Sequence, residues 1–107
     1  MLRVRVLDEA RREYAEAVKW YREEDLDVAR DMVTEYVARI RRARQLPRSG
    51  TLVRSLPARY EVRRFLLGRF PYAVYMAYLP LELVIIAVAH QHRKPGYWRK
   101  RLAKVKP

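Results

Sequence analysis

The chain opens with an alternation of apolar and charged residues. Leu2, Val4 and Val6 alternate with Arg3 and Arg5. A period of two is typical of a strand with one face buried and the other in water. We therefore expect a first strand of about six residues.

The apolar period then becomes helical. Ala10, Tyr14, Ala17, Val18 and Tyr21 recur at helical spacing, which predicts a helix over residues 9–24 with Asp8 at its N-cap. A second apolar stripe runs from residue 29 to residue 43, after a turn and fresh cap at residues 24–27. The short connection predicts an antiparallel helix hairpin.

Beyond Arg59 the pattern changes again. Residues 60–67, 72–79 and 83–90 are three runs rich in Val, Ile, Tyr and Phe, separated by short segments that contain Gly or Pro. They predict a three-stranded antiparallel meander, with the continuously apolar 83–89 segment at the middle of the sheet. Residues 47–59 are expected to form a loop, and residues 97–102 a short C-terminal helix or tail.

The predicted order gives an α+β fold: an N-terminal strand, a helix hairpin, a three-stranded meander and a short tail. Both helices should cover one face of the sheet. With 107 residues, the chain is expected to form a single domain, residues 1–107. The charged N-terminus and the lack of a long apolar run predict a soluble, cytoplasmic protein without a membrane association.

Positive charge is concentrated in the second half of the chain. The first 46 residues hold 11 basic and 10 acidic side chains, whereas the remaining residues hold 13 basic and two acidic ones. Such a surplus favours an anionic partner: nucleic acid, an acidic protein segment or an anionic membrane surface. The simpler alternative is a basic surface that only keeps the protein soluble.

Five arginines lie on or beside the predicted strands. They are Arg59, Arg63, Arg64, Arg69 and Arg93. Several of them are expected to form a concave, positive surface on the sheet face that the helices leave open. Strand alternation puts Arg63 and Arg64 on opposite faces, so both cannot serve one site. Solvated arginines that protect the sheet edges from aggregation are the alternative.

His90 and His92 close the last strand and are the only imidazoles in the chain. Histidine exchanges protons near neutral pH. Together with Glu61 and an arginine, Arg64 or Arg69, His90 supplies the groups needed to cleave RNA through attack by the 2′-OH. The alternative is a hydrogen-bonded structural histidine.

The composition argues against disulfides, metal sites and nucleotide cofactors. The chain has no cysteine, and the two histidines lack a nearby carboxylate, so neither a disulfide nor a metal site is predicted. Its three glycines are widely spaced, which argues against a nucleotide cofactor. Tyr72, Tyr97 and Trp98 are the aromatic side chains most available for stacking on bases.

Three segments together resemble the RelE/ParE superfamily of bacterial toxins. They are Arg69-Phe70-Pro71-Tyr72-Ala73-Val74-Tyr75, the strand that ends Ala87-Val88-Ala89-His90, and Arg93-Lys94-Pro95-Gly96-Tyr97-Trp98; residues 9–13 and 17–21 also look like the family's first helix. The resemblance implies a toxin of a type II toxin–antitoxin system. It also implies a cognate antitoxin that wraps the folded domain, often with a helix across the hairpin.

The superfamily contains two mechanisms. RelE-like members cut messenger RNA on the ribosome with a cluster of lysines and arginines, whereas ParE-like members inhibit DNA gyrase and are not known as enzymes. Residues 47–93 here contain no lysine, and Tyr72 stands where ribonucleolytic relatives often have a basic residue. Both departures, together with the Pro-Gly-Tyr-Trp ending, favour a ParE-like inhibitor that is not an enzyme.

Each mechanism implies its own residues. A gyrase inhibitor would dock its basic half, with Arg63, Arg69, Tyr72, His92, Arg93, Tyr97, Trp98 and Arg99 as candidate target-binding or nucleic-acid-binding residues. A ribosome-dependent ribonuclease would use His90, Arg69, Arg64 and Glu61, with Tyr97 as an alternative to Glu61 in activating the 2′-OH. A third alternative is a relic that binds its antitoxin and acts only in transcriptional autoregulation.

Overall fold

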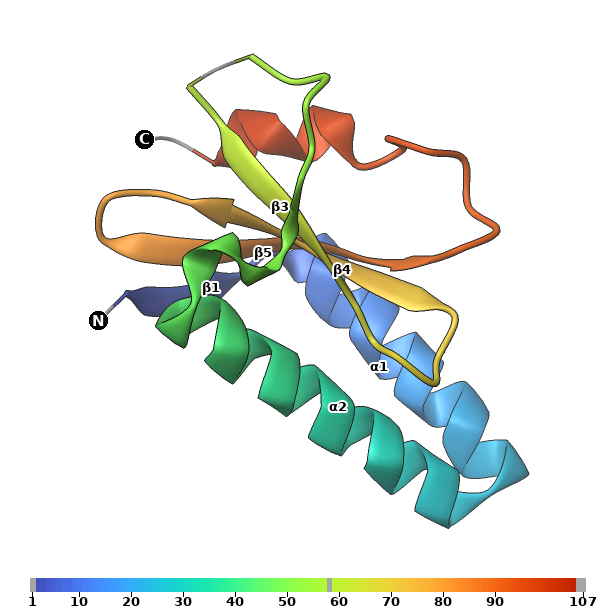
Figure 1. Ribbon diagram of the computed structural model, residues 1–107. Coiled ribbons are helices and arrows are strands. Elements are labelled where there is room, and N and C mark those ends of the chain that lie inside the picture. The colour runs from blue at the N-terminus through green and yellow to red at the C-terminus, as the bar shows by residue number, and fades with distance from the viewer. Residues whose placement is uncertain (1, 58, 106–107) are drawn as a thin grey trace.

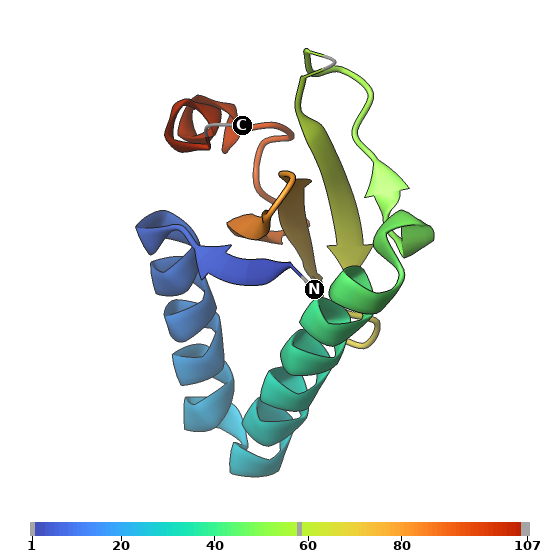
Figure 2. The same cartoon turned by 90° about the vertical axis from the view of Figure 1, so that its left-hand side faces the viewer.

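A five-stranded sheet lies between a helix hairpin on one face and a short C-terminal helix on the other (Figures 1 and 2). The computed structural model describes residues 2–57 and 59–105. In chain order the elements are β1 (Arg3–Val6), α1 (Asp8–Glu24), α2 (Leu26–Gln45), the 3-10 helix η1 (Pro47–Ser49), β2 (Thr51–Leu52), β3 (Glu61–Leu66), β4 (Tyr72–Tyr78), β5 (Glu82–His90) and the 3-10 helix η2 (Arg99–Lys104). This confirms the predicted α+β class and element order.

The strands are arranged in the order β1-β5-β4-β3-β2. β3, β4 and β5 form the predicted antiparallel meander, and β1 pairs with β5 in parallel. The prediction that the last strand is the middle of the sheet is wrong, because β4 holds that position. β5 is nevertheless an interior strand, and its apolar residues 83–89 are all buried, since helices cover one face and the C-terminal segment the other.

Two short elements occupy the segment predicted to be a loop. η1 follows α2, and β2 pairs with β3 through Thr51 opposite Arg64 and Leu52 opposite Arg63. The approach of β2 depends on Gly50, because a Cβ at that position would lie 2.5 Å from the Phe65 ring. A two-residue strand is too short to produce a recognisable alternation.

The helix caps differ from the prediction at one end. α1 begins at Asp8 itself, and the N-cap position is held by the buried Leu7, which offers no side-chain hydrogen bond. Within the predicted cap segment 24–27, Asp25 caps α2, since its carboxylate accepts hydrogen bonds from the backbone N–H groups of Asp27 and Val28 at 2.9 and 3.4 Å. Tyr14 and Tyr36 then stack across the hairpin with ring centroids 3.9 Å apart.

The core includes the C-terminal segment as well as the helices. Trp98, Leu102 and Val105 are buried, and the C-terminal segment that carries them lies on the sheet face opposite the hairpin (Figure 1). Trp98 packs on Tyr75 of β4 at a centroid distance of 4.7 Å. Among the described residues, no helix combines the length and apolar character required to cross a membrane.

Candidate functional site

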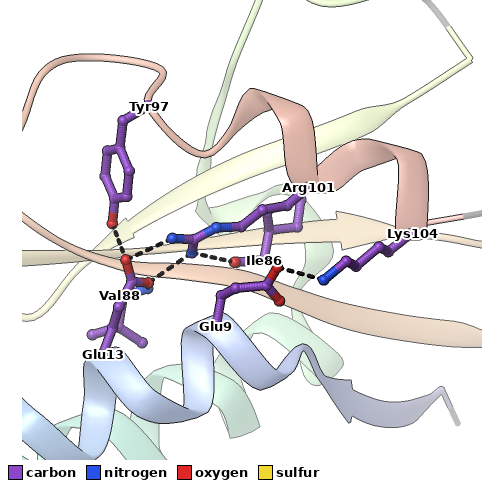
Figure 3. Close-up of polar contacts among 7 residues, drawn as sticks. All are labelled: Glu9, Glu13, Ile86, Val88, Tyr97, Arg101 and Lys104. Atoms are coloured by element: carbon purple, nitrogen blue, oxygen red, sulfur yellow. Dashed lines mark hydrogen bonds and ion pairs between the residues drawn. The ribbon is translucent and has the colours of Figure 1, made fainter.

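A cluster around Glu13 fastens the C-terminal segment to the rest of the domain (Figure 3). Arg101 donates two hydrogen bonds to the Glu13 carboxylate, at 2.8 and 2.9 Å. The Tyr97 hydroxyl donates a third at 2.5 Å, and the backbone N–H of Val88 a fourth at 3.0 Å. The Glu13 and Arg101 side chains are only 14% and 15% exposed, so this ion pair is largely shielded from water.

The same cluster completes an unpaired strand edge. β1 pairs with β5 only as far as Ile85, which leaves the end of β5 without a neighbour on that side. A bulge in the β4–β5 register turns the backbone groups of Ile86 and Val88 toward this edge. Glu13 accepts the Val88 N–H, and Arg101 donates to the Ile86 carbonyl at 3.0 Å. Side chains thus supply hydrogen bonds that a further strand would otherwise make.

The charges in the cluster support one another. Burial disfavours the ionised form of Glu13, yet hydrogen bonds from Arg101, Tyr97 and Val88 hold its pKa below the ordinary 4.5. Burial and the Glu13 carboxylate together raise the pKa of the Tyr97 hydroxyl, so it stays a proton donor. The Glu13 hydrogen bond raises the pKa of Arg101. Nearby, Lys104 of η2 donates to Glu9 of α1, a second tie between the same elements.

A cleft of about 510 Å³ lies beside this cluster, between α1 and the ends of β4 and β5. Its lining includes Glu16, Trp20, Tyr21, Tyr72, His90 and Arg93. Tyr72 and His90 are cross-strand partners, and their rings meet edge to face with centroids 5.0 Å apart. The structure therefore gathers three of the predicted site residues, Tyr72, His90 and Arg93, in one place.

Local contacts set the chemistry of these three residues. The His92 backbone N–H donates to His90 Nδ1 at 3.0 Å, so the neutral His90 ring carries its proton on Nε2. Burial raises the pKa of Tyr72, so its hydroxyl remains protonated. Arg93 stacks on the Tyr97 ring, 3.9 Å from its centroid, and is thereby tied to the Glu13 cluster.

The residues proposed for RNA cleavage do not come together. Glu61 pairs with Tyr78, whereas His90 pairs with Tyr72. These positions are six residues apart on β4, or about 20 Å at the usual strand rise. Arg64 lies on β3, two strands from β5. Arg69 lies in the β3–β4 turn and forms an ion pair with Asp31 of α2 at 3.2 Å. A single site built from His90, Glu61, Arg64 and Arg69 is therefore not formed.

The expectation of one concave, positive sheet face is also wrong. The C-terminal segment covers much of the face that was expected to be open, through the buried Trp98, Leu102 and Val105. On β3, the Arg63 guanidinium is held by the Gly50 carbonyl at 2.8 Å and by Glu61 at 2.9 Å. Arg59 stacks on Tyr60, 4.9 Å from the ring centroid. The five strand arginines thus have separate surroundings.

Two aromatic candidates for base stacking need correction. Trp98 is 2% exposed and belongs to the core, so it offers no surface to a base or a target protein. The Tyr97 hydroxyl is bound to Glu13, and one face of its ring is covered by Arg93. His92 and Arg99 are exposed, and Arg99 donates to the Ser55 hydroxyl at 2.5 Å.

The pair at the centre of the cluster, Glu13 and Arg101, was not among the sequence candidates. Glu13 looks like an ordinary acidic residue near the start of a helix, and Arg101 like part of a basic tail. They lie 88 positions apart, and no local spacing connects them. Within residues 2–57 and 59–105, no three His, Asp or Glu side chains are placed to hold a metal ion.

The fold is similar to that of a solved bacterial protein. A chain from the structure titled "Chromosomal ParDE TA system from P. aeruginosa" superposes with a TM-score of 0.67 at 17% identity, covering 84% of this chain and 96% of that one. No family model matches the sequence, and no curated protein matches it. The likeness confirms a RelE/ParE-like α+β fold.

Proposed function

We propose that this protein is the toxin component of a bacterial type II toxin–antitoxin system. We further propose that it is ParE-like, acts in the cytoplasm and inhibits DNA gyrase by binding. The observation that carries the proposal is the fold shared with a chain of a ParDE system over 84% of the present chain. The Arg69–Tyr75 and Arg93–Trp98 segments support it independently.

The geometry favours an inhibitor over a ribonuclease. Cleavage through the 2′-OH needs a base, an acid and a cation within hydrogen-bond reach of one phosphate. His90 and Arg93 line one cleft, but Glu61 lies at the opposite end of the β4 pairing and Arg69 is paired with Asp31. The alternative to Glu61, Tyr97, has its hydroxyl bound to Glu13. Binding requires no such convergence.

An antitoxin would find an apolar surface on the hairpin. Leu26, Val33 and Val37 of α2 are 50%, 37% and 46% exposed. Their spacing of seven and four residues places them along one side of the helix. An amphipathic segment that covers these side chains would remove them from water. Because the positive charge is concentrated after residue 46, acidic residues elsewhere in the antitoxin would complement that half of the chain. We propose this surface as part of the antitoxin contact.

A supercoiling assay with purified gyrase tests the proposed target directly. We expect the purified protein to inhibit supercoiling. Adding its antitoxin, expected to be the product of the adjacent reading frame, should restore supercoiling. Deleting the residues after Gly96 is a poor probe, because it removes the buried Trp98, Leu102 and Val105 along with the basic side chains. The exposed Arg93 and Lys100 are better targets.

Two double variants that each lose two positive charges are compared. A double variant, Arg93→Gln with Lys100→Gln, should weaken gyrase inhibition, whereas Arg12→Gln with Arg22→Gln on the exposed side of α1 should not. His90→Ala should also leave inhibition intact. Normal supercoiling at saturating toxin would refute the gyrase assignment. Messenger cleavage on translating ribosomes that His90→Ala abolishes would instead establish the ribonuclease.

A further inference from the structure

Two clefts meet at the β2 edge of the sheet. One, of about 490 Å³, is lined on the α2 side by Arg39, Arg42 and Ser49. The other, of about 290 Å³, is lined on the η2 side by Ser55, Tyr75 and Arg99, among others. Both clefts include Thr51 and Arg64, which are cross-strand partners in the β2–β3 pairing. The two clefts therefore adjoin at this pair and make up one path across the edge. The β2 edge lies on the side of the molecule away from α1 (Figure 2).

This path, which we call the edge track, carries positive charge and hydroxyl groups. Its lining contains four arginines and four hydroxyl side chains but no carboxylate. They are Arg39, Arg42, Arg64, Arg99, Ser49, Thr51, Ser55 and Tyr75. Guanidinium and hydroxyl groups are the usual side-chain donors to phosphate oxygens.

Part of this charge is uncompensated. Arg42 and Arg64 form no ion pair with any side chain that the structure describes. Arg39 is bound to Glu35 at 3.5 Å, and among the described residues the side-chain partner of Arg99 is the neutral Ser55. Unneutralised arginines close together repel one another, so an anion at the edge track would relieve this repulsion.

Two glycines allow the edge track to take its shape. Gly50 lies flat against the Phe65 ring and so brings Thr51 beside Arg64. Gly96 has a φ of +75°, and a Cβ there would lie 2.6 Å from Arg99 Nε. A larger residue at position 96 would displace the Arg99 guanidinium from the cleft as well as strain the backbone.

We propose that the edge track binds the phosphodiester backbone of a nucleic acid. The aromatic side chains of the lining are largely engaged in packing, since Phe65 and Trp98 are buried and the half-buried Tyr75 packs one face against Trp98. Contacts to phosphate without base stacking carry little sequence information. Apart from Tyr75, the lining contains none of the side chains that usually act as a general acid or base, and one such group does not supply the acid–base pair that cleavage needs. We therefore expect the edge track to hold DNA or RNA without sequence preference and without cutting it, a property distinct from gyrase inhibition.

Fluorescence anisotropy with short labelled nucleic acids tests this proposal without gyrase. The full chain is titrated into duplex DNA, single-stranded DNA and RNA at several salt concentrations. Each nucleic acid is used in one sequence and in a scrambled version of that sequence. We expect binding to weaken as salt rises and to be insensitive to scrambling. The double variant Arg42→Gln with Arg64→Gln should lower the log–log salt slope by about two units, one for each lost phosphate contact.

The control removes the same charge elsewhere. Arg12→Gln with Arg22→Gln on α1 should leave the slope unchanged, and circular dichroism should show that both double variants are folded. An equal loss in both variants, or no binding at low salt, would overturn the proposal. Displacement of the labelled DNA by polyglutamate as effectively as by unlabelled DNA would indicate that the edge track takes an acidic protein instead.

Discussion

Glu13 and Arg101 form a two-pronged ion pair between the first helix and the last one, 88 positions apart in the chain. The pair also occupies the unpaired edge of β5, where Glu13 accepts the Val88 N–H and Arg101 donates to the Ile86 carbonyl. Attachment of the C-terminal segment and completion of the sheet therefore depend on the same two side chains.

Replacing Glu13 with Gln should destabilise the domain strongly. The amide would leave the Arg101 guanidinium largely buried without a counter-charge, and breaking such a pair costs about 2–4 kcal/mol. Urea unfolding followed by circular dichroism measures this loss. Asp31→Asn, which breaks the exposed pair with Arg69, should change the unfolding free energy by less than about 1 kcal/mol. Equal effects of the two substitutions would contradict the role assigned to Glu13.

Acid should release this stabilisation. The pKa of Glu13 is lower in the folded chain than its ordinary value of 4.5, and Lys104 likewise lowers the pKa of Glu9. The unfolded chain therefore takes up protons first as pH falls. The stabilisation is complete above about pH 4.5 and disappears as pH falls through the folded pKa values. As pH is lowered from neutral, the urea concentration at the unfolding midpoint should decrease over this pH range. The decrease should be less steep in the Glu13→Gln variant.

The two tryptophans should differ in how much their mutation destabilises the domain and in how readily a quencher reaches them. Trp98 is 2% exposed and Trp20 is 56% exposed. Trp98→Ala should cost about 3–5 kcal/mol by leaving a cavity between the C-terminal segment and β4, whereas Trp20→Ala should cost less than about 1 kcal/mol. In single-tryptophan variants, acrylamide should quench Trp20 and leave Trp98 largely protected. Ready quenching of Trp98 would show that the C-terminal segment does not stay on the sheet.

Local patterns predicted most elements, whereas contacts distant in sequence were missed. The strands at 61–66, 72–78 and 82–90 follow from runs of β-branched and aromatic residues. The parallel pairing of β1 with β5 has no local signature, because it joins positions about 80 residues apart. Likewise, the predicted short helix or tail at residues 97–102 did not reveal that Trp98 is part of the core.

The site predictions also succeeded where neighbouring strands determine the contact and failed where the strand register does. Tyr72, His90 and Arg93 come together because β4 and β5 are neighbours in an antiparallel meander, a pairing that the sequence predicts. Glu61 was grouped with His90 by chemistry alone, and strand register places it at the other end of β4. Register depends on turn geometry and packing, which residue type does not reveal.

The contact between Gly50 and Phe65 predicts a specific coupling between two positions. Gly50→Ala would place a methyl group 2.5 Å from the Phe65 ring, so β2 or the ring must move, at a cost of about 1–3 kcal/mol. Phe65→Leu removes the ring and should by itself destabilise the buried site. In the double variant the clash is gone, so the combined loss should be smaller than the sum of the two single losses by more than about 0.5 kcal/mol. Urea unfolding of all four proteins measures this coupling.

Gly68→Ala provides the control, because its Cβ would lie 3.6 Å from the Glu35 carboxylate and away from the Phe65 ring. It carries the strain of a φ of +60°, but its loss of unfolding free energy should simply add to that of Phe65→Leu. Additive losses for Gly50→Ala and Phe65→Leu would show that β2 is not held against this ring.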